Sequence, residues 1–339
     1  MLDAHIEAFT PKVGMARAAT AFGVNPRTHR HRRQQAAGRG RDRTRPRRER
    51  RPPPSQLSSA EKDQVVAVLC EPRFADLAPA QVYAALLDEG TYLCSERTMY
   101  RVLAERGLVK ERRRGGHQRA GAYGVPRLEA TGPNQCWTWD ITKLRGPVPR
   151  TWFFLYAIID IYSRKLVGWT IAHRESETIA KALIATTCRR YGIDRDQLTI
   201  HADRGSPMIA NSVADLMSAM GVTKSHSRPR VSNDNPYIEA QFKTLKYRPD
   251  FPDRFADIAA TRAWMRRYEH WYNHVHYHSA IGYQRPADLH DGTHHTITKR
   301  RNDILQRAYQ HRPDRFRRPP SPPSVPTVAW INKPTIQTT

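Results

Sequence analysis

The chain has 339 residues, enough for two or three domains with at least one substantial hydrophobic core. Its 56 Lys and Arg residues exceed its 32 Asp and Glu residues, for a formal net charge of +24, so we expect nucleic acid as the partner. The four cysteines form no Cys-x-x-Cys pair, and no apolar run could span a bilayer, which argues against zinc ribbons, disulfide scaffolds and membrane proteins. We expect a cytoplasmic protein without a signal peptide, associated with the nucleoid.

Residues 1–38 are predicted to form a helix-turn-helix. Residues 13–21 favour a helix, Gly23 breaks it, and Asn25 and Pro26 supply an N-cap and a first-turn proline for a basic helix. A plain helical hairpin is the alternative.

Residues 39–58 combine dense positive charge with proline, which predicts a disordered linker. We favour a phosphate-binding arm over a simple spacer.

Residues 59–115 are predicted to form a second helix-turn-helix-like DNA-binding domain. Helices are expected over 61–70, from Pro79 to Gly90, and from a Ser95 cap to Gly107. The third helix would expose Arg97, Thr98 and Arg101, whose side chains suit base edges and phosphates. A linker over 116–130 follows.

Residues 131–290 are predicted to form an α/β core. Strands are expected over 135–142, 151–161, 165–172, 198–201 and 222–226, with helices over 176–191, 211–221, 236–247 and 257–273. This order predicts a five-stranded sheet of mixed direction. Residues 291–339 are expected to form a basic, proline-rich C-terminal extension, extended from Arg307 onward, with a docking segment over 328–331.

Three acidic residues stand in separate elements of this core. Asp140 lies in an aromatic strand, Asp203 follows the fourth strand, and Glu239 lies in the first turn of a helix with Asn235 as N-cap and Pro236 at the first position. Three converging carboxylates would repel one another unless cations were present. Two divalent ions would relieve the repulsion and support phosphoryl transfer, and ligands that are all oxygen favour Mg²⁺ or Mn²⁺. Ordinary surface acids are the alternative for any one of the three.

The sequence around these acids resembles the DDE transposases of bacterial insertion sequences of the IS3 type, which have a retroviral-integrase-like catalytic core. The resemblance rests on Trp137-x-x-Asp140, on the run from His201 to Ser206, on the run from Asn233 to Lys246 and on the 35 residues between Asp203 and Glu239. It implies that Asp140, Asp203 and Glu239 bind metal and catalyse, and that the helical units bind terminal inverted repeats. The overall fold would be multidomain: all-α helix-turn-helix units plus a ribonuclease H-like core. The chain departs from the pattern in having Ala202, where serine is common, and in lacking a leucine-heptad segment.

Several neighbouring residues have two interpretations. Lys243 and Lys246 lie on the same helix face as Glu239, where contact with DNA phosphates is favoured over a surface ion pair. Arg228 and Arg230, together with Lys224, flank a loop that could bind DNA. His201 is either a site residue or a buried structural one. For His274, His276 and His278 a structural role is favoured over zinc, and Asp160 is expected to order the turn through Ser163 and Arg164.

These observations together predict a transposase that binds double-stranded DNA as a dimer or higher oligomer. It would cleave one strand and use the freed 3′-hydroxyl to attack a second phosphodiester. A transposase-derived regulator with an inactive core is the main alternative. A nuclease of RNA–DNA hybrids is less favoured, because hybrids are recognised mostly by shape.

Overall fold

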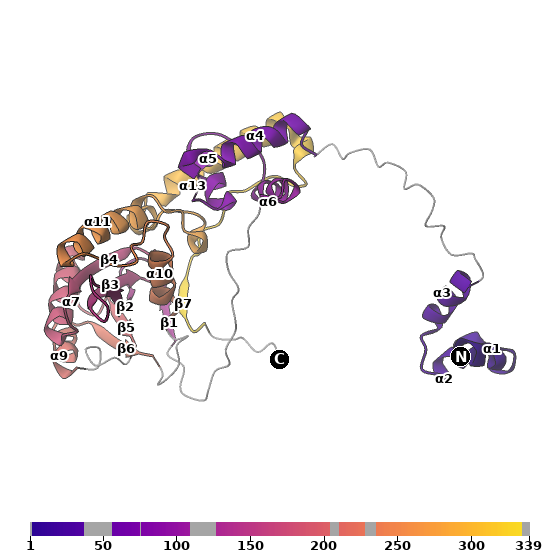
Figure 1. Ribbon diagram of the computed structural model, residues 1–339, viewed down its shortest axis with the longest axis horizontal. Coiled ribbons are helices and arrows are strands. Elements are labelled where there is room, and N and C mark those ends of the chain that lie inside the picture. The colour runs from indigo at the N-terminus through magenta and orange to yellow at the C-terminus, as the bar shows by residue number, and fades with distance from the viewer. Residues whose placement is uncertain are drawn as a thin grey trace. The chain divides into compact units, whose positions relative to one another are not determined.

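The computed structural model describes residues 2–36, 56–74, 76–108, 127–203, 210–227 and 235–333. The chain separates into two compact units, Met1–Pro53 and Pro54–Thr339. Figure 1 labels their elements. The predicted basic linker lies almost entirely outside the described residues, as does most of the predicted linker over 116–130. Among the described helices, none is both long and apolar enough to cross a membrane.

Residues 2–36, the part of the first unit that the structure describes, form three helices, one more than the sequence predicted. They are α1 (Leu2–Val13), α2 (Met15–Ala21) and α3 (Pro26–Ala36). The helix α1 was not predicted, and it contains Pro11 near its C-terminal end. Gly23 adopts a φ of 69°, and Asn25 Oδ1 accepts a hydrogen bond from Arg27 N (2.9 Å), as expected for a turn followed by an N-cap.

The second helical region agrees with its predicted elements within two residues. It contains α4 (Ser59–Leu69), the 3₁₀ turn η1 (Pro72–Phe74), α5 (Pro79–Asp88) and α6 (Glu96–Glu105). The N-cap residues are Ser58, which forms a capping box with Glu61, and Ser95, which accepts from Thr98 N. A small core that includes Val65, Val82, Met99 and Val102 holds the helices together.

A five-stranded mixed sheet forms the centre of the second unit. Its strands are β2 (Cys136–Arg145), β3 (Trp152–Asp160), β4 (Leu166–Ala172), β5 (Thr199–Ala202) and β6 (Thr223–His226), in the order β4-β3-β2-β5-β6. The β4–β3 and β3–β2 pairs are antiparallel, whereas β2–β5 and β5–β6 are parallel. The predicted ribonuclease H-like core with a mixed five-stranded sheet is therefore confirmed.

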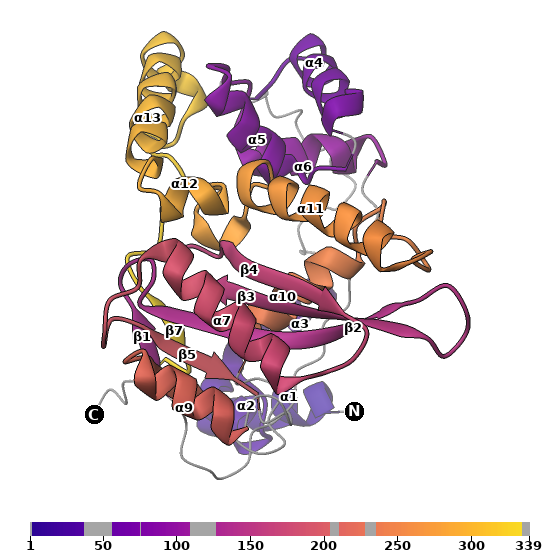
Figure 2. The same ribbon diagram turned by 90° about the vertical axis from the view of Figure 1, so that its left-hand side faces the viewer.

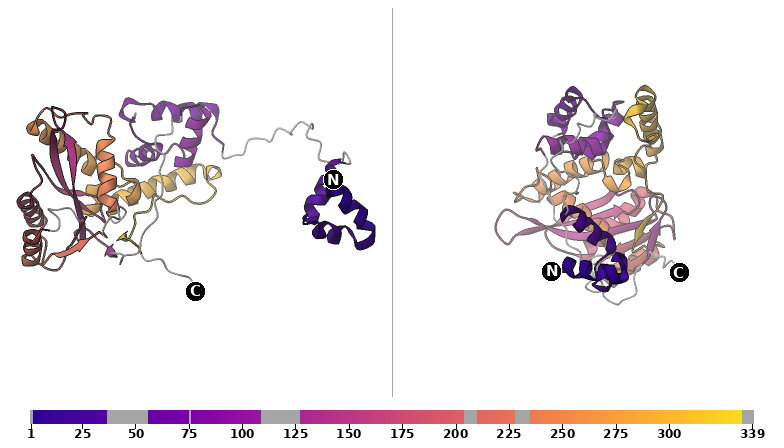
Figure 3. Two further views of the ribbon diagram at one scale, coloured as in Figure 1. Left: turned by 60° about the horizontal axis from the view of Figure 1, so that its bottom comes forward. Right: turned by 90° about the vertical axis from the view of Figure 1, so that its right-hand side faces the viewer.

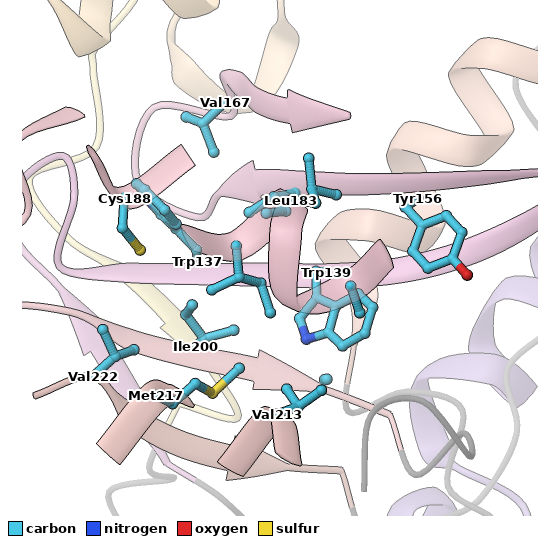
Figure 4. Close-up of a cluster of buried hydrophobic side chains, with 14 of the residues drawn as sticks. Trp137, Trp139, Tyr156, Val167, Leu183, Cys188, Ile200, Val213, Met217 and Val222 are labelled. Atoms are coloured by element: carbon cyan, nitrogen blue, oxygen red, sulfur yellow. The ribbon is translucent and has the colours of Figure 1, made fainter. Parts of the chain in front are cut away.

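Helices cover both faces of the sheet (Figure 2). On one face, α7 (Glu177–Tyr191) and α9 (Asn211–Ala219) pack on a cluster that contains Trp137, Trp139, Ile200 and Val213 (Figure 4). On the other, α10 (Pro236–Lys246) and α11 (Ile258–His274) pack on Leu155, Ile159 and their neighbours. Because both faces are buried, β3 reads as an almost continuous apolar run.

The C-terminal region departs from its prediction as an extended tail. After η3 (Ser279–Ile281) and α12 (Pro286–His290), α13 runs from His294 to His311 and so includes Arg307, which was expected to be extended. The helix forms because Ile297, Arg301, Ile304 and Leu305 recur at helical spacing and are buried. After η4 (Pro313–Arg315), β7 (Ala329–Ile331) pairs antiparallel with β1 (Leu128–Ala130), which confirms the predicted docking segment.

A buried ion pair connects α5 to α13, which lie side by side (Figure 3). The guanidinium of Arg301 donates to both carboxylate oxygens of Asp88, at 2.7 and 3.0 Å, and to the backbone oxygens of Gly282 and Tyr283. Tyr277 Oη also donates to Asp88, at 2.9 Å. This ion pair therefore attaches the helical region that precedes the sheet in the chain to α13, which follows the sheet.

Candidate active site

The sheet brings Asp140 and Asp203 to adjacent positions. In the parallel register of β2 and β5, Trp139 pairs with Ala202, so Asp140 and Asp203 are the next residues along the two strands. The carboxylate of Asp140 accepts a hydrogen bond from Ile141 N at 2.7 Å, and that of Asp203 accepts one from Ser227 Oγ at 2.5 Å. Each of the two carboxylates therefore accepts one hydrogen bond, from a neighbour in the chain for Asp140 and from a residue 24 positions away for Asp203.

Glu239 joins them from α10, whose first turn is fastened to β2. Asn235 is the N-cap, as predicted, but its side chain makes no capping bond. Instead, its buried amide accepts from Thr138 Oγ1 and donates to Trp139 O at 3.5 Å. The sequence reveals no signal for this tie, because it depends on two residues 97 positions apart. It fixes the start of the helix beside the strand that carries Asp140.

The three carboxyl groups interact electrostatically. Burial raises the pKa of Asp140 to about 7, with smaller contributions from the charges of Asp203 and Glu239 and an opposing one from Ile141 N–H. Burial also raises the pKa of Glu239, which the charge of Lys243 lowers and that of Asp203 raises. The structure thus places the three predicted acids within electrostatic reach of one another.

The donor set suits a hard cation, although it does not form a closed ligand shell. Carboxylate oxygens are preferred by Mg²⁺ and Mn²⁺, and a nearby cation would offset the unfavourable burial of Asp140. In the described ranges, no three His, Cys, Asp or Glu side chains are gathered closely enough to hold an ion together. The three carboxylates therefore lie near one another without forming a complete ligand shell, and their oxygen atoms are of the type that binds divalent ions.

A hollow of about 470 Å³ lies beside Glu239. It is lined by Thr142, Glu239, Phe242, Lys243, Lys246 and Tyr247. Lys246 Nζ donates to Thr142 Oγ1 at 2.7 Å, and burial lowers the pKa of Lys246 while the charge of Asp140 raises it. Both predicted lysines thus border the hollow that Glu239 lines, and Thr142 is a further lining residue that the sequence did not indicate.

The other predicted DNA contacts lie elsewhere or are not described. Arg97 and Arg101 are exposed on α6, and Arg101 Nη2 donates to Thr98 Oγ1 at 3.4 Å. These residues belong to the helical region, where α6 contacts α4 and α5. Arg228 and Arg230 lie outside the described residues.

Several histidines and Asp160 have structural surroundings. Burial lowers the pKa of His276 to about 4 and that of His278 to about 3, and the ring of His276 lies 4.8 Å from that of Trp271. Neutral, packed rings at these two positions agree with the predicted structural role, whereas His274 is exposed. Asp160 accepts from Ser163 N and Oγ at 2.7 and 2.8 Å, so it orders the turn as expected.

Comparisons with known proteins identify the central region. Two models described as integrase core domain match residues 130–232 and 220–286. The chain is 30% identical to the transposase for insertion sequence element IS904 of Lactococcus lactis over 165 residues, which is 48% of this chain and 63% of that protein. It is 28% identical to transposase InsF for insertion sequence IS3A of Escherichia coli, over 50% of this chain and 60% of that protein. The matches therefore span about three fifths of these relatives.

Solved structures with a similar fold include two from T-cell lymphotropic viruses. One is a simian T-cell lymphotropic virus intasome, with 19% identity over 62% of this chain and 74% of that chain and a TM-score of 0.39. Another is the HTLV-2 integrase catalytic core domain in complex with magnesium, with 14% identity over 47% of this chain and 97% of that chain and a TM-score of 0.34.

Proposed function

We propose that this chain is a DNA transposase of the integrase-core type found in bacterial insertion sequences of the IS3 type, because two integrase-core models match it and it is similar to insertion-sequence transposases. It would bind the terminal inverted repeats of its element, cleave one strand and transfer the resulting 3′ end to another DNA. The observation that carries this proposal is the electrostatic coupling of Asp140, Asp203 and Glu239, which come from three separate elements.

These three residues would hold Mg²⁺ or Mn²⁺ through their carboxylate oxygens. When bound, a pair of such ions activates the attacking oxygen and stabilises the leaving oxygen in phosphoryl transfer. Ile141 N and Ser227 Oγ donate hydrogen bonds to two of the carboxylates. In hydrolysis, water attacks the phosphorus and the 3′-oxygen leaves with a proton; in transfer, that 3′-hydroxyl attacks a second phosphodiester and another 3′-oxygen leaves.

The basic side chains would bind the DNA around this centre. Lys243 and Lys246 border the same hollow as Glu239, so a phosphate beside the scissile bond could contact both. Arg97, Thr98 and Arg101 would contact the terminal repeat from α6. Paired transposon ends require at least two copies of the chain, and the reaction would take place on DNA in the cytoplasm.

Cleavage and strand transfer test the proposal directly. The full chain would be incubated with Mg²⁺ or Mn²⁺ and labelled duplexes made from the DNA flanking its gene. We expect nicking and transfer by the wild type, loss of both in Asp203→Asn, and DNA binding retained in that variant. Asp303→Asn, which alters an exposed acid on α13, is the matched control and should stay active.

Two outcomes would contradict the assignment. If the Asp203→Asn variant still cleaves DNA, the acidic residues do not take part in the reaction. Tight, specific binding by the wild type without any cleavage would favour the regulator, in which the core serves only as a scaffold.

A further inference from the structure

A row of polar side chains, of which His201 and Ser227 are buried, lies behind Asp203. His201 on β5 pairs in register with Ser225 on β6, and Ser227 follows β6 directly. His201 Nδ1 lies 3.0 Å from Ser225 Oγ, and His201 Nε2 lies 3.2 Å from Ser227 Oγ. Ser227 Oγ in turn lies 2.5 Å from Asp203 Oδ1. Four side chains from two neighbouring strands therefore form one continuous chain of hydrogen bonds.

The chemistry of the groups sets the direction of each bond. An ionised Asp203 can only accept, so Ser227 donates its hydroxyl proton to Oδ1. The oxygen of Ser227 is then an acceptor for His201 Nε2–H. A neutral imidazole with its proton on Nε2 leaves Nδ1 to accept from Ser225 Oγ. Every donor in this arrangement meets an acceptor.

Burial makes the arrangement rigid. His201 has no exposed surface, and Ser227 is 2% exposed. Polar groups at such depth keep their partners, because a broken hydrogen bond is not replaced by one to water. The orientation of Ser227, and through it that of Asp203, is therefore tied to the register of β5 and β6.

We propose that Ser227 is a positioning residue for Asp203, with His201 and Ser225 orienting the Ser227 hydroxyl. This inference rests on the proposed function, in which Asp203 holds a divalent cation. A carboxylate with one oxygen fixed has fewer orientations to lose when a cation binds, so the bond raises cation affinity. Partners that orient metal-binding carboxylates typically contribute 10–100-fold in affinity or activity.

Ser227→Ala and Ser227→Thr in the full-length protein test the proposal, with Mn²⁺ binding followed by the electron paramagnetic resonance signal of free Mn²⁺. We expect Ser227→Ala to weaken Mn²⁺ binding roughly 10–100-fold and to raise the Mn²⁺ concentration for half-maximal DNA cleavage to the same extent. Ser227→Thr restores the hydroxyl and should recover most of the affinity. DNA binding in EDTA should be the same in both variants.

Three further variants separate positioning from packing. Ser225→Ala removes the far end of the chain and should weaken Mn²⁺ binding by a smaller factor than Ser227→Ala. Ser218→Ala removes an exposed hydroxyl from α9 and should change nothing. In an Asp203→Asn background, Ser227→Ala should have no additional effect on Mn²⁺ binding.

The possible failures are distinguishable. If the wild type cleaves DNA and Ser227→Ala binds Mn²⁺ as tightly, the positioning role is wrong while the proposed function stands. If Ser227→Ala lowers the melting temperature and weakens Mn²⁺ binding equally in both backgrounds, Ser227 contributes only packing. If the wild type neither binds Mn²⁺ nor cleaves DNA, both proposals are overturned.

Discussion

Asp140 occupies an unfavourable place for a negative charge. It lies on the central strand, is partly buried and feels the charges of Asp203 and Glu239, and burial raises its pKa from 3.8 to about 7. A buried acidic residue with a purely structural role is normally paired with a cationic side chain. The cost of ionising Asp140 indicates a residue arranged for a ligand that supplies positive charge.

The pKa of Asp140 predicts how the stability of the metal-free protein depends on pH. Between pH 3.8 and 7 the Asp140 carboxyl group loses its proton in the unfolded chain but keeps it in the folded chain. The contribution of Asp140 to the free energy of unfolding therefore falls as pH rises through that window. Asp140→Asn removes the penalty. In EDTA we expect the variant to be more stable than the wild type by roughly 1–4 kcal/mol at pH 8, and by less at pH 5.

Urea denaturation at the two pH values measures this difference. Asp303→Asn, at an exposed position, should show none. Added Mg²⁺ should stabilise the wild type and leave Asp140→Asn nearly unchanged. An Asn variant that is less stable at pH 8 would show that ionised Asp140 is well accommodated without a cation.

At the scale of elements, the close approach of α7 to β4 depends on Gly168. A Cβ atom at this position would collide with the side chain of Thr187, whose Cγ2 and Cβ would lie 3.1 and 3.3 Å away. Threonine is branched at Cβ and has little freedom to move inside a helix. We expect Gly168→Ala to lower the free energy of unfolding by about 1–3 kcal/mol.

A second-site change checks the cause of this destabilisation. Gly168→Ala combined with Thr187→Ala should recover part of the stability in urea titrations. Gly132→Ala, whose Cβ would make only an ordinary contact of 3.4 Å with Gln135, is the control. Equal destabilisation in the single and double variants would mean that the strand, rather than the helix contact, requires glycine.

The ion pair between α5 and α13 predicts a second effect at this scale. Asp88→Asn would leave the 1%-exposed guanidinium of Arg301 without its counter-ion, which typically costs about 3–5 kcal/mol. Asp253→Asn breaks the Arg145 pair, whose side chains are 57% and 78% exposed, and should cost under about 1 kcal/mol. Similar urea midpoints for the two variants would contradict the structural importance of the buried pair.

Local signals explain which elements the sequence predicted. The caps at Ser58 and Ser95 and the apolar strand from Trp152 to Asp160 depend on neighbours within a few residues, so their elements were found. The helix α13 was not predicted, because Arg301 is buried through Asp88, 213 residues away. The tie from Asn235 to Thr138 and the bond from Ser227 to Asp203 were missed for the same reason.

The candidate acids were found because each belongs to a motif that is readable along the chain, whereas their electrostatic coupling depends on strand register. Parallel pairing of β2 with β5 brings together residues about 60 positions apart, and no local pattern specifies that register. The two predicted arginines at 228 and 230 stay predictions, as do the contacts of α6 with DNA.

For the whole molecule, charge is distributed unevenly between the two compact units. Residues 1–53 carry 14 Lys and Arg against four Asp and Glu, a large share of the net charge of +24. Because the chain separates at Pro53, removal of residues 1–53 should leave the urea midpoint of the remainder unchanged. The truncated chain would neutralise fewer phosphates, so it should bind DNA more weakly. The slope of the logarithm of its DNA-binding constant against the logarithm of salt concentration should be shallower by about 0.9 for each phosphate that the first unit neutralises.

Binding of the full chain and of residues 54–339 to one duplex, measured at several salt concentrations, tests this expectation. The two affinities should differ most at low salt and converge at high salt, because counterion release drives the binding of the basic segment to phosphates. A constant difference across salt would indicate that the first unit binds through hydrogen bonds to bases. A lower urea midpoint for residues 54–339 would show instead that the first unit stabilises the second, so the weaker DNA binding would no longer report charge alone.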